Sequence, residues 1–254
     1  GSIDILWMDG AWVRPFRNIP REFESWAKKD SFNQDVNIPR IAEMARSHQP
    51  GLIIVDRWVN GEYENYLTPE NKIPDKAMSV PWEACIPMAT SWSYKQNDEY
   101  KSERELVHLL VDVTAKGGNL LLNIAPSPDG EWDSDAYDRL KGIGEWMKIN
   151  SEAIYSTKPI YPYKSENVCF TSGKNGLIYA IYLVDDKTPK IPGIITLPSN
   201  KITKGKQIYL LGYESKLKVR KQNIGSKEMI SVSIPDKFRK SLPYKHTLTF
   251  KLNP

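Results

Sequence analysis

The order of strand-like and helix-like segments is the feature that most constrains this chain, because that order changes near residue 156. Before this point, short apolar runs alternate with segments of helical period, whereas after it only short β-type runs follow one another. Alternation is typical of a parallel α/β sheet, and consecutive short strands indicate an antiparallel sandwich. The chain is therefore expected to hold two different architectures in succession.

The alternating part begins with the strand-like runs IDILWMD and GLIIVDR, which flank a helix predicted in NIPRIAEMARSH. After a long loop, Ser102 and Glu105 form a capping-box pattern ahead of LVHLLVDVTAK, and Gly117-Gly118 ends that helix. NLLLNIAP is the next predicted strand, and DSDAYDRLKGIGEWMKIN the next helix. This β-α-β, loop, α-β-α order predicts a parallel sheet of the kind that can close into a barrel.

The second part contains six short runs rich in β-branched and aromatic residues, which predict an antiparallel sandwich. These runs are VCFTSG, LIYAIYLV, GIITLP, QIYLLGY, MISVSIP and HTLTFKL. Pro159 and Pro162 interrupt the pattern in SEAIYSTKPIYPY. We therefore expect one domain over residues 1–158 and a second over residues 159–254.

Composition separates the same two parts. All eight tryptophans precede residue 150, and 17 basic and 25 acidic residues precede residue 156, whereas 18 basic and 6 acidic residues follow it. The basic part could bind nucleic acid or acidic polysaccharide. Its lysines are scattered without an aromatic platform, so a solvated strand face is the favoured interpretation of KLKVRKQNIGSK, and no nucleic-acid partner is expected.

Other classes of function lack a sequence signal. No apolar run approaches the roughly 20 residues that a membrane span needs. The two cysteines and three histidines lack the spacing of a metal site, so no metal is expected.

Charged residues stand at the ends of the first two predicted strands. Asp9 follows IDILWM, and Arg57 ends GLIIVDR, so parallel neighbouring strands would bring both to the carboxyl mouth of the sheet, where barrel enzymes hold their active sites. The alternatives are that Asp9 caps a loop or pairs with Arg14, and that Arg57 pairs with Asp56 or Glu62.

The segment WVNGEYENYLTPENKIPDK has the length of a functional loop and offers Glu62, Glu64 and Glu70. Two carboxylates at one mouth are what glycoside hydrolysis requires, one ionised and one with a raised pKa. Trp7 and Trp12 flank Asp9, and their apolar ring faces suit the C–H face of a sugar.

Five motifs in order resemble the α-L-fucosidases of glycoside hydrolase family 29. They are IDILWMDG, GLIIVDRW, PWEACIPMATSWSY, KGGNLLLNIAPSPDGEW and IGEWMKINSEAIYST, and they cover about residues 2–160. The resemblance implies a catalytic (β/α) barrel-like domain followed by a C-terminal β-sandwich. It also implies hydrolysis of terminal α-L-fucose with retention, through a covalent glycosyl-enzyme intermediate and without a cofactor.

The resemblance also implies roles for single residues. The aspartate of the W-x-D-G motif falls on Asp9 as nucleophile, and the arginine of the D-R-W motif falls on Arg57, which would contact the fucose and the nucleophile. Trp92 falls on the aromatic position that lines the sugar pocket, although Ser93 stands where many relatives have glycine.

The acid/base residue is assigned to Glu70, in the T-P-E run of the long loop. Glu62 and Glu64 are the next candidates. Glu83, in PWEAC, is the last candidate, although it aligns with a Trp-Glu pair that we interpret as structural or as supporting the residues that contact the sugar.

Residues 1–155 are too few for a complete barrel of about 250 residues. The expected fold is therefore the second part of a (β/α)8-like TIM barrel followed by an antiparallel β-sandwich, with the N-terminal half of the barrel as a partner. The expected substrate is a fucosylated oligosaccharide or glycoconjugate, and the alternative is a non-catalytic fucose-binding relic. Analogy with the family suggests a periplasmic, secreted or lysosomal-type location.

Overall fold

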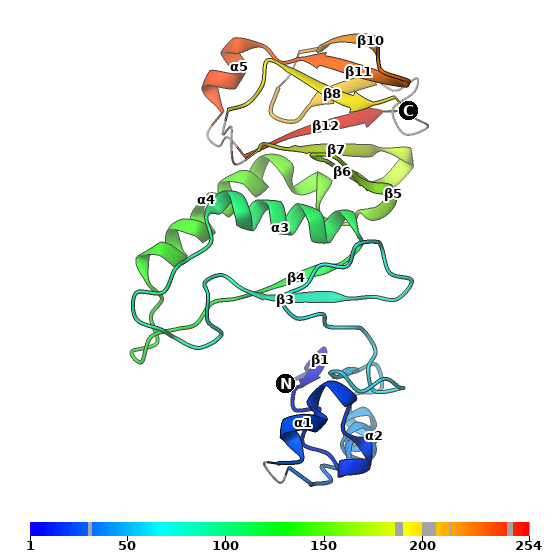
Figure 1. The fold of residues 1–254 in the computed structure, drawn as a ribbon, viewed down its shortest axis with the longest axis vertical. Helices are drawn as coiled ribbons and strands as arrows, with labels where there is room; N and C mark the ends of the chain where they lie inside the picture. The colour runs from blue at the N-terminus through cyan, green and yellow to red at the C-terminus, as the bar shows by residue number, and fades with distance from the viewer. Residues whose placement is uncertain (30–31, 186–189, 200–206, 214, 243–245, 254) are drawn as a thin grey trace. The chain divides into compact units, whose positions relative to one another are not determined.

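The structure is a computed structural model that describes residues 1–29, 32–185, 190–199, 207–213, 215–242 and 246–253 (Figure 1). The fold is mixed α/β, and the chain forms two compact units. Unit 1 comprises residues 1–69 and 79–83, and unit 2 comprises residues 70–78 and 84–254. Each unit is described by itself.

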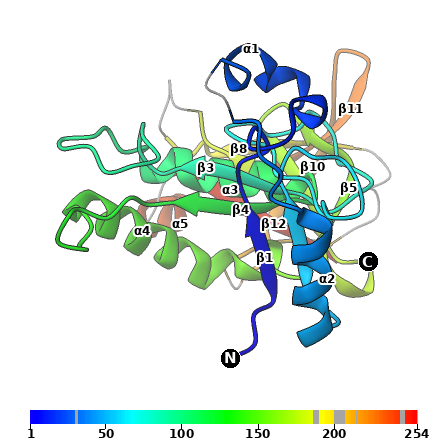
Figure 2. The ribbon, with the colours of Figure 1, turned by 90° about the horizontal axis from the view of Figure 1, so that it is seen from below.

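Unit 1 is built on two parallel strands and a helix. Strands β1 (Ile5–Met8) and β2 (Ile53–Asp56) pair in parallel, with Met8 opposite Asp56. Helix α2 (Ile38–His48) lies alongside β1 in Figure 2 and packs on the strands through a small apolar core that includes Ala42 and Ile54. The predicted β-α-β order of this segment is confirmed.

The connection from β1 to α2 contains structure that the sequence pattern did not predict. It holds the short helices η1 (Phe16–Asn18), η2 (Arg21–Phe23) and α1 (Glu24–Ala27). Asn37 caps the start of helix α2. Its backbone is left-handed (φ 50°), and its side chain accepts a hydrogen bond from the Arg40 N–H. Pro39 lies in the first turn, where a missing N–H costs no helical hydrogen bond.

A second strand pair belongs to unit 2, apart from Glu83, its first residue. Strand β3 (Glu83–Pro87) pairs with β4 (Asn119–Asn123). The Met88 N–H, just past the end of β3, donates to the carbonyl of Asn123 at the end of β4 over 2.8 Å. Because the two carboxyl ends meet, the strands run in the same direction.

Helices α3 (Glu103–Ala115) and α4 (Ser134–Asn150) follow these strands, and 3₁₀ helix η3 (Ser151–Ala153) extends α4. The predicted capping box of α3 is present: the Ser102 side chain accepts from the Glu105 N–H at 3.2 Å, and the Glu105 carboxylate accepts from the Ser102 N–H at 2.7 Å. The local pattern therefore fixes where α3 begins.

Two antiparallel sheets form the rest of unit 2, as the six β-type runs predict. One sheet has the order β5-β6-β7-β12-β9, and the other β10-β11-β8. The bounds are β5 (Lys158–Ser165), β6 (Val168–Ser172), β7 (Ile178–Leu183), β8 (Ile194–Pro198), β9 (Gln207–Leu210), β10 (Lys218–Ile224), β11 (Lys227–Ser233) and β12 (Thr247–Asn253). Helices η4 (Lys174–Gly176) and α5 (Asp236–Ser241) complete the unit.

The main core of unit 2 joins both sheets to the two long helices. Val107 and Val111 of α3 and Trp146 of α4 share a buried cluster with Phe170 and Phe250 from the sheets. The indole N–H of Trp146 donates to the Thr247 hydroxyl at 2.6 Å, which satisfies the polar end of this buried ring. The expected boundary between residues 158 and 159 stays a prediction, since both residues belong to unit 2.

Pro159 and Pro162 both lie within β5, whose pairing with β6 is irregular between Pro159 and Lys164. Strand β5 is the outermost strand of its sheet, and an edge strand has one side without ladder partners, so it accepts residues without an N–H.

Two further features concern the described residues alone. None of their helices has both the length and the apolar character that a membrane crossing requires. Nor do three or more of their His, Cys, Asp and Glu side chains gather in an arrangement able to hold a metal ion.

Candidate active site

Asp9 and Arg57 meet because each directly follows a strand of the parallel pair in unit 1. Met8 lies opposite Asp56 in the register, and the Arg57 N–H donates to the Met8 carbonyl at 3.3 Å. This pairing brings Arg57 Nη1 to 3.2 Å from Asp9 Oδ1. The proximity expected from the strand order is confirmed.

One alternative, the pairing of Asp9 with Arg14, is wrong. Asp9 does not pair with Arg14, because the Arg14 guanidinium forms a buried ion pair with Asp56, the last residue of β2. Burial raises the pKa of Asp56, and Arg14 acts against that rise. Arg14 is thus engaged by Asp56, and Arg57 faces Asp9.

The Asp9 carboxylate is held by one of its oxygens. Within the described residues, both of its hydrogen bonds end on Oδ1, from Arg57 and from the Gly10 N–H at 2.9 Å, so Oδ2 carries none. Half of the Asp9 side chain is exposed, at 50%. Gly10 has a φ of 99°, a conformation that glycine adopts without strain and that turns the chain directly after Asp9.

Arg57 is fixed on several sides, and only 4% of its side chain is exposed. Its Nε–H donates to the Thr68 hydroxyl at 3.0 Å. Its Cζ lies 4.5 Å from the ring centroid of Trp7 and 5.7 Å from that of Trp58, so both rings offer their π-faces to the cation. The guanidinium is therefore preorganised toward Asp9.

Sequence reasoning missed Thr68 and Trp58 as partners of Arg57. Thr68 stands two residues before Glu70 in the T-P-E run, and Trp58 belongs to the D-R-W motif, so both lay inside motifs already singled out. No spacing rule connects residue 57 with residue 68, because the loop between them has no regular period.

Two candidate acids of the long loop belong to unit 1. Glu62 is exposed and hydrogen-bonds the Tyr63 hydroxyl, which raises the pKa of that tyrosine. Glu64 is half-buried, and its carboxylate accepts from the Trp58 N–H at 3.1 Å. Burial raises the pKa of Glu64, against the opposing effect of that hydrogen bond.

Glu83 is the third candidate acid that belongs to unit 1. The Tyr66 hydroxyl donates to its Oε1 at 3.3 Å, and burial raises its pKa. The nearby indole N–H of Trp7 acts to lower the pKa of Glu83. It forms no well-aligned hydrogen bond within the described residues. Glu83 therefore has the raised pKa that an acid needs and contacts the ring that packs on Arg57.

Glu70 and Trp92 belong to unit 2. Glu70 is half-buried and forms a bridge with Cys85 of β3, and the next residue, Asn71, donates its N–H to the Cys85 carbonyl at 2.9 Å. Trp92 lies in the loop after β3 and is 39% exposed. The side-chain amide of Asn123, at the end of β4, donates to the Trp92 carbonyl at 3.0 Å.

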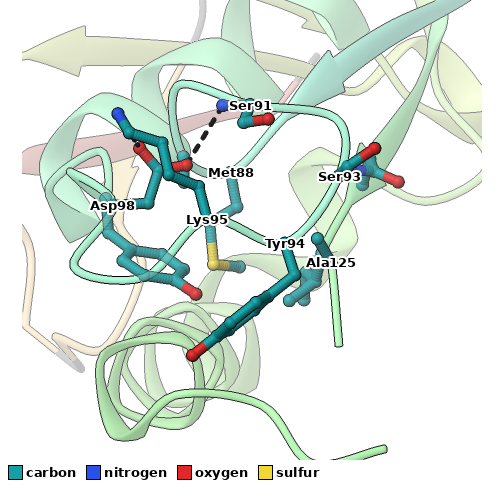
Figure 3. A pocket seen from close by; sticks show the side chains of 11 residues that line it. Met88, Ser91, Ser93, Tyr94, Lys95, Asp98 and Ala125 are labelled. Carbon is teal, nitrogen blue, oxygen red and sulfur yellow. Dashed lines mark hydrogen bonds and ion pairs between the residues drawn. The ribbon is translucent and has the colours of Figure 1, made fainter. Parts of the chain in front are cut away.

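Asp98 braces the loop that carries Trp92 (Figure 3). Its carboxylate accepts hydrogen bonds from the Thr90 hydroxyl, the Ser91 N–H at 3.1 Å and the Glu99 N–H at 2.9 Å, and lies 3.3 Å from Lys95 Nζ. These interactions, led by Thr90, lower the pKa of Asp98 to about 2. The carboxylate is therefore ionised over the whole physiological range.

A small pocket lies between this loop and the residues after β4. Its lining includes Ser91, Ser93, Tyr94 and Ala125, and Figure 3 shows Tyr94 extending past Ala125. Ser93, the residue that follows Trp92, is one of the residues that line this pocket.

Comparison with known proteins decides the family. A family model described as "Alpha-L-fucosidase" matches residues 1–152, which include both strand pairs and the Asp9–Arg57 contact. The chain belongs to the α-L-fucosidase family.

The relatives of this fucosidase-family chain include a curated mouse protein. The "Tissue alpha-L-fucosidase" of Mus musculus is 30% identical over 98% of this chain and 53% of its own length. The chain thus spans about half the length of the curated relatives it matches.

Solved fucosidase structures share the fold. α-L-Fucosidase isoenzyme 1 from Paenibacillus thiaminolyticus matches with a TM-score of 0.77 and 25% identity, over 100% of this chain and 58% of its own. The Thermotoga maritima α-fucosidase, solved in complex with a mechanism-based inhibitor, matches with a TM-score of 0.67 and 26% identity, over 86% of this chain and 48% of its own.

Proposed function

We propose that this chain is part of a retaining exo-α-L-fucosidase that removes terminal α-L-fucose from oligosaccharides or glycoconjugates, with Asp9 as nucleophile. The observation that carries the proposal is the Asp9–Arg57 contact at the ends of β1 and β2. A half-exposed carboxylate, held through Oδ1 by a buried cation, presents Oδ2 for attack. Membership of the family supplies the substrate class.

The proposed reaction has two steps. Oδ2 of Asp9 attacks the anomeric carbon and forms the glycosyl-enzyme ester, while the bond to the leaving oxygen breaks and that oxygen takes a proton from the acid/base residue. The same residue then removes a proton from water, which attacks the anomeric carbon and releases Asp9. Two inversions at one carbon leave the product with the configuration of the substrate.

We assign the acid/base role to Glu70, with Glu62, Glu64 and Glu83 as alternatives. The assignment rests on the position of Glu70 in the T-P-E run. Glu64 accepts a hydrogen bond from the Trp58 N–H, and Glu83 accepts one from the Tyr66 hydroxyl. Their raised pKa values keep them as competitors, because an acid must be protonated when the leaving group departs.

The remaining assignments concern binding and architecture. Arg57 orients the Asp9 carboxylate and contacts the sugar, and Trp92 packs its exposed ring on the C–H face of fucose. The parallel pairs β1–β2 and β3–β4 support a second part of a (β/α)8-like barrel, which the N-terminal part of the family's catalytic domain would complete. A periplasmic, secreted or lysosomal-type location follows by analogy with the family.

Release of the aryl group from an aryl α-L-fucoside tests the proposal. Asp9→Asn is expected to remove turnover by on the order of 1,000-fold or more, because the amide is a poor nucleophile, while the far-UV circular dichroism stays unchanged. Asp4→Asn is the matched control, since Asp4 is an exposed carboxylate of the same unit. Full activity in Asp9→Asn would overturn the assignment.

An inactive wild-type protein would leave two alternatives, a part of the enzyme that needs the N-terminal half of the barrel or a non-catalytic fucose-binding relic. Saturable binding of L-fucose in calorimetry that Trp92→Ala weakens, with no turnover over long incubation, would identify the relic. Absence of binding as well would contradict the relic.

A further inference from the structure

A continuous cluster of five aromatic rings lies in unit 1. Trp58 contacts Phe23 with a centroid distance of 6.3 Å, and Phe23 contacts Trp12 at 5.7 Å and Trp26 at 6.1 Å. Trp12 and Trp26 lie 5.5 Å apart, and Phe32 follows Trp26 at 6.0 Å. We call these five residues the aromatic cluster.

The aromatic cluster is not a core. Each of its rings keeps part of its surface in solvent, and Trp26 is 38% exposed. Large aromatic side chains contribute most to folding when they are buried, whereas an exposed group of them marks a binding surface. The cluster therefore has surface available for a ligand.

The aromatic cluster begins at the proposed catalytic residues. Trp58 directly follows Arg57, and its ring lies 5.7 Å from the Arg57 guanidinium carbon that faces Asp9. The Trp58 backbone is left-handed, with a φ of 66°, and its N–H is held by Glu64. The ring thus joins the Asp9–Arg57 pair to the other four rings.

The remaining rings come from the segment between β1 and α2. In a parallel α/β fold, the connection after the carboxyl end of a strand lies on the face that carries the active site. The helices η2 and α1 also place exposed polar residues, Glu22, Glu24 and Ser25, around Phe23 and Trp26. Rings interleaved with polar groups suit a sugar, whose C–H faces alternate with hydroxyls, better than a wholly apolar protein surface.

We propose that the aromatic cluster binds the neutral sugar units on the leaving-group side of the scissile bond, and so selects fucose carried on an oligosaccharide. This inference rests on the proposed function and specifies its substrate class. Free fucose would occupy the other side of the bond and is expected not to contact Trp26.

Binding of three sugars, measured by calorimetry, tests the inference: L-fucose, lactose and 2′-fucosyllactose. The measurements use the Asp9→Asn background, which is expected not to hydrolyse the trisaccharide, and this protein is expected to bind 2′-fucosyllactose more tightly than L-fucose. Trp26→Ala is expected to weaken binding of 2′-fucosyllactose and lactose about three- to tenfold, and to leave L-fucose unchanged. Trp132→Ala is the matched control, because Trp132 is 36% exposed, lies in unit 2 and also contacts another ring, Tyr137.

The outcomes separate this inference from the proposed function. Equal affinity for L-fucose and 2′-fucosyllactose, or no effect of Trp26→Ala, would overturn the cluster's role while fucose binding stands. Binding of lactose that depends on Trp26 but without binding of L-fucose would support the aromatic cluster as a sugar site and contradict the fucosidase proposal.

A second measurement needs no variant. N-Bromosuccinimide oxidises accessible indoles, and mass spectrometry locates the product. We expect 2′-fucosyllactose to protect Trp26 in the wild-type protein and to leave oxidation of Trp132 unchanged. Protection of Trp26 before any sugar is added would show that another part of the protein covers the cluster, and would overturn the inference.

Discussion

Arg57 depends on a hydroxyl eleven residues further along the chain. Thr68 is 4% exposed and accepts the Arg57 Nε–H, so its loss leaves a buried charged donor without that acceptor. Thr68→Val is expected to destabilise the fold by about 1–3 kcal/mol and to lower kcat/KM for an aryl fucoside, because Arg57 then loses its fixed orientation toward Asp9. Denaturant unfolding and steady-state kinetics measure the two effects.

Thr68→Ser separates the hydroxyl from the packing of the methyl group. This variant keeps the acceptor, so it is expected to restore most of the activity. Equal loss of kcat/KM in Thr68→Ser and Thr68→Val would contradict a role for the hydroxyl.

The expected effect of replacing Glu70 depends on the leaving group of the substrate. Glu70→Ala is expected to slow substrates with poor leaving groups far more than activated aryl fucosides, because protonation matters least when the leaving group is already stable. The ratio of kcat/KM for 2′-fucosyllactose and for an aryl fucoside measures this. Glu64→Gln and Glu83→Gln serve as comparisons, and the same selective loss in one of them instead would move the acid/base role to that residue.

At the scale of elements, the capping box of α3 is a local device whose contribution can be isolated. Ser102→Ala removes the hydroxyl that accepts the Glu105 N–H and is expected to destabilise the protein by about 1 kcal/mol. Thermal unfolding at neutral pH measures the loss. An unchanged melting temperature would mean that packing alone fixes the start of the helix.

The stabilisation that the Glu105 carboxylate contributes to the capping box depends on pH. The N–H and hydroxyl of Ser102 lower the pKa of Glu105, so the folded state binds this proton less readily than the unfolded chain. The stabilisation is therefore present above the unfolded pKa of about 4.3 and is lost as the pH falls through the folded pKa. The stability difference between wild type and Glu105→Gln is expected to shrink below about pH 4, and a constant difference would contradict this.

Elements were predictable where one local pattern was strong. Helix α3 has a capping box and a helical period, and β1 and β2 are short apolar runs that end in charged residues, so type and position follow from the residues. Strand β3 was not predicted, because PWEACIP is short, lacks alternation and carries proline at each end. Strand β5 accommodates its prolines at a sheet edge and with an irregular register between Pro159 and Lys164.

At the scale of the whole molecule, His246 connects α3 with the sheets of unit 2. It is 8% exposed, its carbonyl accepts from His108 Nε2 at 2.9 Å, and its Nε2 lies 2.9 Å from Glu103 Oε1. Burial, with smaller effects of His108 and Arg104, lowers the pKa of His246 to about 4. The Glu103 contact alone would act in the opposite direction, but burial dominates, and it also raises the pKa of Glu103.

The sign of the pH dependence follows from that pKa. Between about pH 6.5, the ordinary histidine value, and about pH 4, the unfolded chain binds a proton that folded His246 does not. Stability is therefore expected to fall as the pH decreases through this window, and His246→Gln is expected to flatten the slope. Denaturant unfolding at several pH values measures it, and greater stability at the acidic end would show that the charged Glu103 pair dominates.

The sequence by itself determined the family, the change from parallel α/β to antiparallel structure, and the meeting of Asp9 with Arg57. These features follow from short-range patterns, because residues that end neighbouring parallel strands lie at one edge of a sheet. Tertiary structure alone decided that Arg14 pairs with Asp56, that Thr68 holds Arg57, and that five aromatic residues from residue 12 to residue 58 form one cluster. Such contacts depend on how loops without a regular period fold back on the strands, and residue spacing along the chain does not predict how they do so.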